Sequence, residues 1–135
     1  MHIANGHYTG ALRTHSTHLA SGAQLHTDAP KDNHGMGEAF SPTDLCAVSL
    51  GSCLVTVMGI HARAKGTDLD GMSWTVSKVM AANPRRIEKI RIEISWPTAG
   101  QQDPKLLDEL KEIALHCPVA KSLSAGLEQE IIFNW

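Results

Sequence analysis

The sequence predicts an α+β fold with antiparallel strand pairing. Three observations lead to this prediction. A long apolar stretch from Leu45 to Ile60 follows a strong helix-start signal. Residues 90–96 alternate between apolar and polar side chains, which is typical of a strand in a sheet with one exposed face. The predicted elements follow one another in the order βββ-α-ββ-α-α-β, an order that favours α+β over a parallel α/β sheet.

The first third of the chain is predicted to be extended. Residues 7–17 and 23–28 are rich in Thr, Leu and Tyr, and Ser21-Gly22 is a turn signal between them. Residues 29–37 contain several Pro, Asp, Asn and Gly residues, and we expect them to form a loop.

A long helix is predicted to follow this loop. Ser41 can cap it, Pro42 suits its first position and Asp44 can complete a capping box. We expect the helix to run to about Lys65 and to end at Gly66. Apolar side chains cover nearly its whole circumference, so the helix is expected to be buried on most sides. These side chains are Leu45, Val48, Leu50, Leu54, Val57, Met58 and Ile60.

The second half is predicted to alternate between strands and helices. Strands are expected at Trp74–Met80 and Ile87–Trp96, with a turn at residues 83–86. An amphipathic helix opens at Asp103-Pro104 and ends before Pro118. A short helix is then expected from Pro118 to about Ala125, and a last strand from Leu127 to Trp135.

Length and charge limit the possible functions. The 135 residues suit one domain, residues 1–135, and the formal charge of -2 argues against a nucleic-acid surface. The longest uncharged apolar run, Leu45 to Ile60, has 16 residues, which is fewer than the roughly 20 that a membrane span needs. The first residues do not resemble a secretory signal, so we expect a cytoplasmic protein with no membrane partner.

Three cysteines in a reducing compartment point to chemistry or to packing rather than to a disulfide scaffold. Cys46 and Cys53 are separated by about 10.5 Å of helix rise, so an intact helix prevents a bond between them. Any intrachain disulfide must therefore involve Cys117. Cys117 precedes Pro118 and is expected to cap the short helix, which would make it the more acidic thiol by local reasoning. The alternative is that all three thiols are simply packed.

Two other kinds of site are weaker alternatives. His116 beside Cys117 suggests a cysteine–histidine catalytic pair, although adjacent residues at a helix start usually point apart. The histidines and cysteines show no close-spaced ligand pair, so no metal and no cofactor are expected. His15 and His18 would face opposite sides of a strand.

Three motifs carry a resemblance to a known family. They are Gly37-Glu38-Ala39-Phe40-Ser41-Pro42-Thr43-Asp44-Leu45, Leu50-Gly51-Ser52-Cys53 and Cys117-Pro118-Val119-Ala120-Lys121-Ser122-Leu123. In these motifs and in the order of its predicted elements, the chain resembles the OsmC/Ohr family of osmotically inducible and organic hydroperoxide resistance proteins. The resemblance covers almost the whole sequence.

The resemblance implies an intertwined homodimer, in which antiparallel sheets wrap around long central helices. It also implies a stress-response peroxidase that reduces organic hydroperoxides with redox-active cysteines. Cys53 matches the peroxidatic cysteine of the family and Cys117 the resolving one. Glu38 matches an acidic residue that precedes the helix, and Arg13 matches an arginine held near the reactive thiolate.

The mechanism that the resemblance implies begins with a thiolate. A free cysteine is only about 3% ionised at pH 7, so Cys53 needs a cation, which Arg13 oriented by Glu38 would supply. Cys53 attacks the peroxide, the resulting sulfenic acid condenses with Cys117, and a small dithiol or a lipoylated or thiol protein restores both thiols. This order of attack follows the family, although local reasoning favours Cys117 as the more acidic thiol. The competing hypothesis is a dimeric, non-enzymatic module that binds small apolar ligands or senses oxidants.

Overall fold

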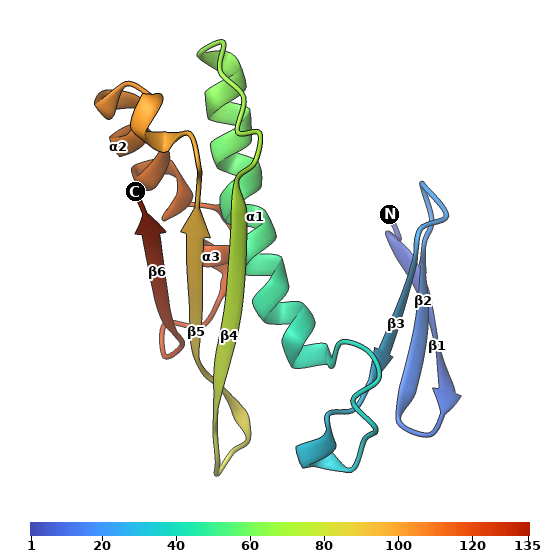
Figure 1. Cartoon of the computed structure of the whole chain (residues 1–135). Helices are drawn as coiled ribbons and strands as arrows, with labels where there is room; N and C mark the ends of the chain where they lie inside the picture. Colours follow the sequence, from blue (N-terminus) through green and yellow to red (C-terminus); the bar gives the residue numbers. More distant parts are fainter. The chain divides into compact units, whose positions relative to one another are not determined.

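The computed structural model describes all residues from Met1 to Trp135. The chain divides into two compact units, residues Met1–Cys46 and residues Ala47–Trp135, which are described in turn. Figure 1 labels their helices and strands. Helix α1 (Pro42–Ala64) begins in the first unit and continues into the second.

The first unit contains an antiparallel sheet of three strands. Strands β1 (Ala4–Gly10), β2 (Arg13–His18) and β3 (Gln24–Asp28) pair in the order β1-β2-β3. The extended segment expected at residues 7–17 is therefore two strands. Between them, Gly10, Ala11 and Leu12 all have positive φ angles, of 90°, 52° and 61°, and they reverse the chain. Sequence analysis missed this turn because Ala and Leu are not turn residues.

The predicted loop after β3 is confirmed, and it contains one short 3₁₀ helix, η1 (Lys31–Asn33). At Gly35 the backbone passes so close to the Ala29 carbonyl that a Cβ would lie 1.7 Å from its oxygen. Only glycine fits there. The loop ends where the Asp28 amide donates to the Phe40 carbonyl, at 3.1 Å.

The predicted helix start of α1 is confirmed. The Ser41 amide donates to Asp44 Oδ2 at 2.9 Å, and the Asp44 amide donates to Ser41 Oγ at 3.0 Å, which is a reciprocal capping box. The helix ends at Ala64, and Gly66 has a φ of 74°, as expected for the residue after a helix.

The expectation that α1 is buried on most sides is confirmed only in part, because most of the helix is buried or partly buried while one stripe is exposed. One side carries the buried residues Ala47, Leu50, Gly51, Leu54, Met58 and Ala62. The other side carries exposed residues, including Ser52, Thr56 and Ile60. By length and composition α1 could also cross a membrane, a test that the core helix of a soluble protein passes as well.

The second unit contains a three-stranded sheet in the order β4-β5-β6. Strand β4 (Ser73–Ala81) pairs with β5 (Arg86–Ser95) in antiparallel fashion, as predicted. Strand β6 (Glu128–Asn134), however, pairs with β5 in parallel, so the expectation of purely antiparallel sheets is wrong. The cause is the long connection between β5 and β6, which crosses over and returns the chain to the same end of the sheet.

That connection holds a 3₁₀ turn, η2 (Ala99–Gln101), and the helices α2 (Pro104–Ala114) and α3 (Pro118–Ser122). Asp103 caps α2 by accepting from the Lys105 amide at 3.0 Å. Helix α3 ends at Ser122, a few residues earlier than expected. One hydrophobic core joins one face of the sheet to α1 and α2, and its fully buried residues include Ile90, Ile92, Ile94, Leu54, Met58 and Leu110.

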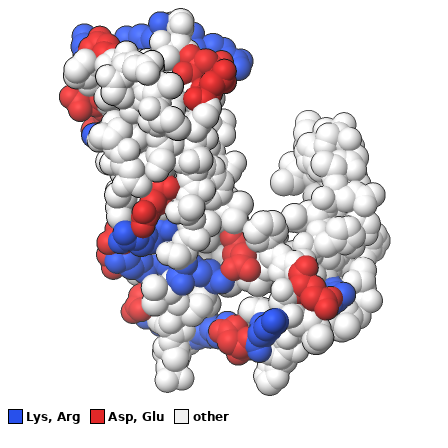
Figure 2. Space-filling view, viewed as in Figure 1, with Lys and Arg blue, Asp and Glu red and all other residues white.

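Charged side chains are unevenly distributed in the first unit. Arg13 is the one charged residue among the first 27 side chains, and Asp28 follows at the end of β3. Figure 2 shows that the visible charge of this unit is gathered at one end, while the rest of its visible surface carries none. The ends of β2 and β3 that meet the loop are therefore the electrostatically distinct part of this sheet.

Candidate active site

The four residues predicted for the site form two pairs, one in each unit. Cys53 and Cys117 belong to the second unit, and Arg13 and Glu38 belong to the first. Each pair is held by its own local structure.

Cys53 lies on α1 between the fully buried side chains of Leu50 and Leu54, and it is itself partly buried against the core. The helix is seated closely at this point. A Cβ on Gly51 would lie 2.4 Å from the Trp74 ring, so the missing side chain allows Trp74 to pack on the helix backbone two residues before Cys53. The position of Cys53 therefore depends on a close contact between helix and sheet.

Cys117 caps α3, as its position before Pro118 predicted. Its backbone is extended, with φ of -63° and ψ of 152°, and Pro118 occupies the first turn. Cys117 Sγ accepts a hydrogen bond from the Ala120 amide at 3.4 Å. The residue is only 1% exposed, so this thiol is held inside the core.

The two thiols meet. The side chains of Cys53 and Cys117 are close enough to interact, since the Cys53 thiol raises the pKa of Cys117, although the two residues lie 64 positions apart in the sequence (117 minus 53). No disulfide is present, and Cys46, on the same helix as Cys53, is partly buried. The structure thus brings together the two cysteines that the resemblance singled out.

The expectation that the helix end makes Cys117 acidic is wrong. Burial raises the pKa of the Cys117 thiol above its ordinary value, and its contact with the Cys53 thiol raises that pKa further. The Ala120 and Val119 amides lower the pKa, but by less. Sequence reasoning included the amides at the helix start and omitted the desolvation, which favours the neutral thiol.

The predicted pairing of Arg13 with Glu38 is present in the first unit. Arg13 begins β2, and its Nη2 donates to Glu38 Oε2, on the loop that leads to α1. The two side chains are 40% and 58% exposed, so water screens this ion pair in the single chain. The hydrogen bond to Glu38 is the main cause that raises the pKa of Arg13, which therefore stays a cation.

Sequence reasoning missed a third member of this cluster, Asp28. The register of β2 and β3 places Asp28 directly opposite Arg13, and Arg13 Nη2 lies 3.4 Å from Asp28 Oδ2. The same oxygen accepts from the Glu38 amide at 2.9 Å. The Asp28 side chain is only 1% exposed. Its place at the end of a predicted strand, in a segment poor in charge, was the signal available in the sequence.

Asp28 is held as a carboxylate. The hydrogen bond from the Glu38 backbone is the largest cause that lowers the pKa of Asp28, and attraction to Arg13 lowers it too, against an opposing effect of burial. Together, Arg13, Asp28 and Glu38 border a cavity of about 250 Å³, which His26 and Thr9 also line. The His26 ring stacks on His15, with ring centroids 4.5 Å apart.

The alternative sites gain no support from the geometry. His116 is exposed, and its Nδ1 lies 2.9 Å from the Glu112 carbonyl oxygen, whereas the neighbouring Cys117 is buried. No group of three His, Cys, Asp or Glu side chains is arranged to hold a metal ion. The two thiols and the Arg13 cluster are therefore the chemically distinctive groups of the chain.

Comparison with protein families gives a match to the family described as OsmC-like protein, over residues 35–131. This chain belongs to the OsmC-like family. The matched range contains Glu38, Cys53 and Cys117, while Arg13 and Asp28 precede it. No protein of curated function matches the sequence.

Solved structures of this family share the fold. A protein of Psychrobacter arcticus 273-4, described provisionally as an osmotic stress induced and detoxification response protein, is 45% identical. It aligns with a TM-score of 0.94 over 99% of this chain and 96% of its own. An organic hydroperoxide resistance protein OsmC of Legionella pneumophila is 18% identical, with a TM-score of 0.76 over 98% and 96% of the two chains.

The organic hydroperoxide resistance protein OhrB of Bacillus subtilis is similar as well. It is 16% identical and aligns with a TM-score of 0.67 over 97% of both chains. At these lower identities the likeness shows the fold alone. The names of the Legionella and Bacillus proteins refer to organic hydroperoxide resistance, and the name of the Psychrobacter protein refers to osmotic stress and detoxification.

Proposed function

We propose that this OsmC-like protein is a thiol-dependent peroxidase that reduces organic hydroperoxides to alcohols. The observation that carries the proposal is the proximity of Cys53 and Cys117, because two neighbouring thiols can form a disulfide after small movements. The names of relatives as organic hydroperoxide resistance proteins suggest the substrate class.

The proposed cycle has three steps. The Cys53 thiolate attacks the distal oxygen of ROOH, the O–O bond breaks, and RO⁻ takes a proton to leave as ROH. Cys53 is then a sulfenic acid, and the Cys117 thiol condenses with it to give a disulfide and water. A dithiol reduces that disulfide by exchange and is itself oxidised, which restores both thiols.

The roles of the two cysteines follow from their surroundings. Cys117 is buried and its pKa is raised, so it stays a neutral thiol and is poorly suited to attack peroxide first. Cys53 is less buried and is the better candidate for contact with substrate. This division supports the assignment of Cys53 as the attacking residue and of Cys117 as the resolving residue.

Cys53 still needs a cation, because its place inside a helix leaves no backbone amide to donate to the sulfur. Lowering a thiol pKa from about 8.5 to about 6 asks for roughly 3.4 kcal/mol in favour of the thiolate. We propose that the guanidinium of Arg13 supplies this preference in the assembled protein, oriented by Glu38. In a site that excludes water, the attraction between a guanidinium and a thiolate is stronger than in solution.

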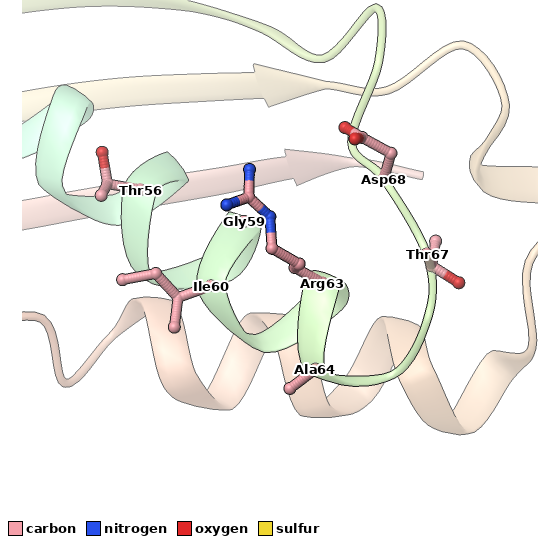
Figure 3. Close-up of a pocket in the computed structure, with 7 residues that line it drawn as sticks. All are labelled: Thr56, Gly59, Ile60, Arg63, Ala64, Thr67 and Asp68. Atoms are coloured by element: carbon pink, nitrogen blue, oxygen red, sulfur yellow. The ribbon is translucent and has the colours of Figure 1, made fainter.

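We propose that the assembly is a homodimer, in which the open side of α1 packs against a second copy. Ile60 is 66% exposed there, on a stripe of the helix that also exposes the polar residues Ser52 and Thr56. Ile60 lines the groove drawn in Figure 3, which lies at the end of α1 and has a volume of about 570 Å³. Its lining residues are Thr56, Gly59, Ile60, Arg63, Ala64, Thr67 and Asp68. The exposed Ile60 at this groove is the observation that supports the proposed interface.

We also propose a cytoplasmic location, where a dithiol or a lipoylated protein could serve as reductant. Three thiols with no disulfide fit a reducing compartment. The overall charge of -2 gives no reason to expect a nucleic-acid partner.

Steady-state turnover of cumene hydroperoxide with a dithiol tests the proposal. The wild-type protein should consume peroxide, Cys53→Ser should abolish turnover, and Cys46→Ser should retain it as the matched control on the same helix. Mass spectrometry after one equivalent of peroxide should give a Cys53–Cys117 bond with Cys46 still a thiol. A bond through Cys46 would contradict the assignment. Absence of turnover, with an apolar ligand still bound by Cys53→Ser, would favour a non-enzymatic binding module.

A further inference from the structure

Asp28 is a buried carboxylate to which the proposed cycle gives no role. Its side chain is 1% exposed at the end of β3. Oδ2 serves two neighbours at once, since it accepts from the Glu38 amide at 2.9 Å and lies 3.4 Å from Arg13 Nη2. Asp28 therefore touches both members of the Arg13–Glu38 pair, one through its side chain and the other through its backbone.

This arrangement is costly to a folded sheet. Asp28 Oδ1 and Arg13 Nε are both buried without a hydrogen-bond partner. A buried carboxylate oxygen without a partner carries a desolvation cost. The amides of Glu38, Met36 and Ala29 and the Arg13 guanidinium offset part of this cost, because each of them favours the carboxylate.

The contacts of Glu38 show what Asp28 adds. The Glu38 side chain is 58% exposed, and it holds Arg13 from an exposed loop. An exposed ion pair gives little positional order, because water and salt compete for both groups. Asp28 is the rigid partner, since the β2–β3 register fixes it opposite Arg13. It also fixes the loop by accepting from the Glu38 amide.

We propose that Asp28 is the positioning residue of this site: its carboxylate holds the Arg13 guanidinium and the Glu38 backbone in one arrangement, so that the cation meets the Cys53 thiolate already oriented. The proposal rests on the proposed function, because Arg13 is the group through which Asp28 acts. Positioning groups one step removed from the reacting atoms often change rates by about 10–100-fold.

A double-mutant cycle tests the proposal. Asp28→Ala should lower kcat/KM for cumene hydroperoxide by about 10–100-fold in the wild-type background. In an Arg13→Ala background the same substitution should change it by less than about 2-fold, because the group it positions is gone. Asp28→Asn keeps the acceptor for the Glu38 amide and should lose less than Asp28→Ala. An equal loss in both backgrounds would mean a structural role and would overturn the proposal.

Ser41→Ala is the matched control. Ser41 is also buried and hydrogen-bonded in the first unit, but it caps α1 and does not contact Arg13. Its substitution should lower activity by the same factor, whatever that is, with and without Arg13. Coupling of Ser41→Ala to Arg13 as strong as that of Asp28→Ala would count against a specific role for Asp28.

Hydrogen exchange gives a second readout that needs no turnover. The Glu38 amide should lose its protection in Asp28→Ala and keep most of it in Asp28→Asn, while amides in β5 stay protected in both. Unchanged protection of Glu38 in a folded Asp28→Ala protein would overturn the proposal. If the wild-type protein failed to reduce peroxide, the proposed function would be wrong, and this exchange measurement would still decide whether Asp28 anchors the pair.

Discussion

At the level of single residues, the proposed chemistry depends on how two thiols differ. Cys117 is buried, its Sγ accepts a hydrogen bond from the Ala120 amide, and its pKa is raised. Cys53 is only partly buried. Desolvation outweighs the helix-end effect at Cys117, because a short helix end contributes only about 0.3–1 kcal/mol. Cys117 therefore remains a neutral thiol next to Cys53, the proposed nucleophile.

Removing the Cys117 thiol should stop the cycle after its first step. Cys117→Ser should react once with cumene hydroperoxide, and Cys53 should then persist as a sulfenic acid, because no second thiol is there to condense with it. Labelling with dimedone followed by mass spectrometry measures this product. The Cys46→Ser protein should give no dimedone adduct, since its Cys117 remains. A stable sulfenic acid on Cys46 would be inconsistent with the assigned roles.

At the level of elements, the seating of α1 on the sheet decides where Cys53 lies. The core residues Leu50 and Leu54 anchor the helix, and Trp74 from β4 fills the space that Gly51 leaves. Strand and helix meet here with no room for one further methyl group.

Gly51→Ala should therefore destabilise the protein, by about 1–3 kcal/mol, even though alanine favours helices. The new Cβ would lie 2.4 Å from the Trp74 ring, so either the ring or the helix must move. Urea unfolding measures the loss. Gly100→Ala is the control, because no atom lies within 4 Å of the Cβ that it would add, and it should change stability little. Equal stability of Gly51→Ala and wild type would show that Trp74 can move aside freely.

A second link joins α1 to α2 through charge. Glu109 Oε2 lies 2.8 Å from His61 Nε2 and 3.5 Å from Lys65 Nζ. The hydrogen bond with His61 is the main cause that lowers the pKa of Glu109, with help from Lys65. A depressed carboxyl pKa stabilises the fold above its unfolded value, about 4.3, and that stabilisation is lost as pH falls through the folded value.

Glu109→Gln should melt at a lower temperature than wild type at pH 7, and the difference should shrink as the pH falls through the lowered pKa of Glu109, because the protonated acid carries no charge. Thermal unfolding at several pH values measures this. Glu112→Gln, whose carboxylate is 78% exposed and 3.9 Å from His116, should show no comparable pH dependence. A difference between wild type and Glu109→Gln that does not change with pH would refute the role given to this ion pair.

Local signals predicted most elements, whereas the direction of β6 and the place of Asp28 depend on tertiary contacts. The capping box at Ser41 and the cap at Cys117 involve residues close in sequence, so the sequence could predict them. The direction of β6 was not, because it depends on the crossover through α2 and α3. Asp28 was missed for the same reason, since only the strand register places it opposite Arg13.

At the level of the whole molecule, one stripe of α1 stays uncovered in the single chain. One side packs in the core, and the other side exposes Ile60 and borders the groove at the end of the helix. A second copy of the chain would bury this side, as proposed above.

Ile60→Glu should then convert the dimer to a monomer, because a carboxylate would be desolvated in the interface. Size-exclusion chromatography with light scattering measures the mass. Leu115→Glu, at another exposed apolar side chain (47% against 66% for Ile60), is the control and should leave the dimer intact. A wild-type protein with the mass of one chain, or an Ile60→Glu protein that stays dimeric, would contradict the proposed interface.

Because Cys117 caps α3, oxidation of its thiol would affect the backbone of that helix. The sulfur that receives the Ala120 amide is the same atom that would be joined to Cys53 in the proposed cycle. Thiol and disulfide sulfurs are both weak acceptors, but the direction of a disulfide sulfur is fixed by its new covalent neighbour. In the proposed cycle, oxidation would thus loosen the first turn of α3, and this small unwinding would give a reductant a difference in shape between the oxidised and the reduced protein.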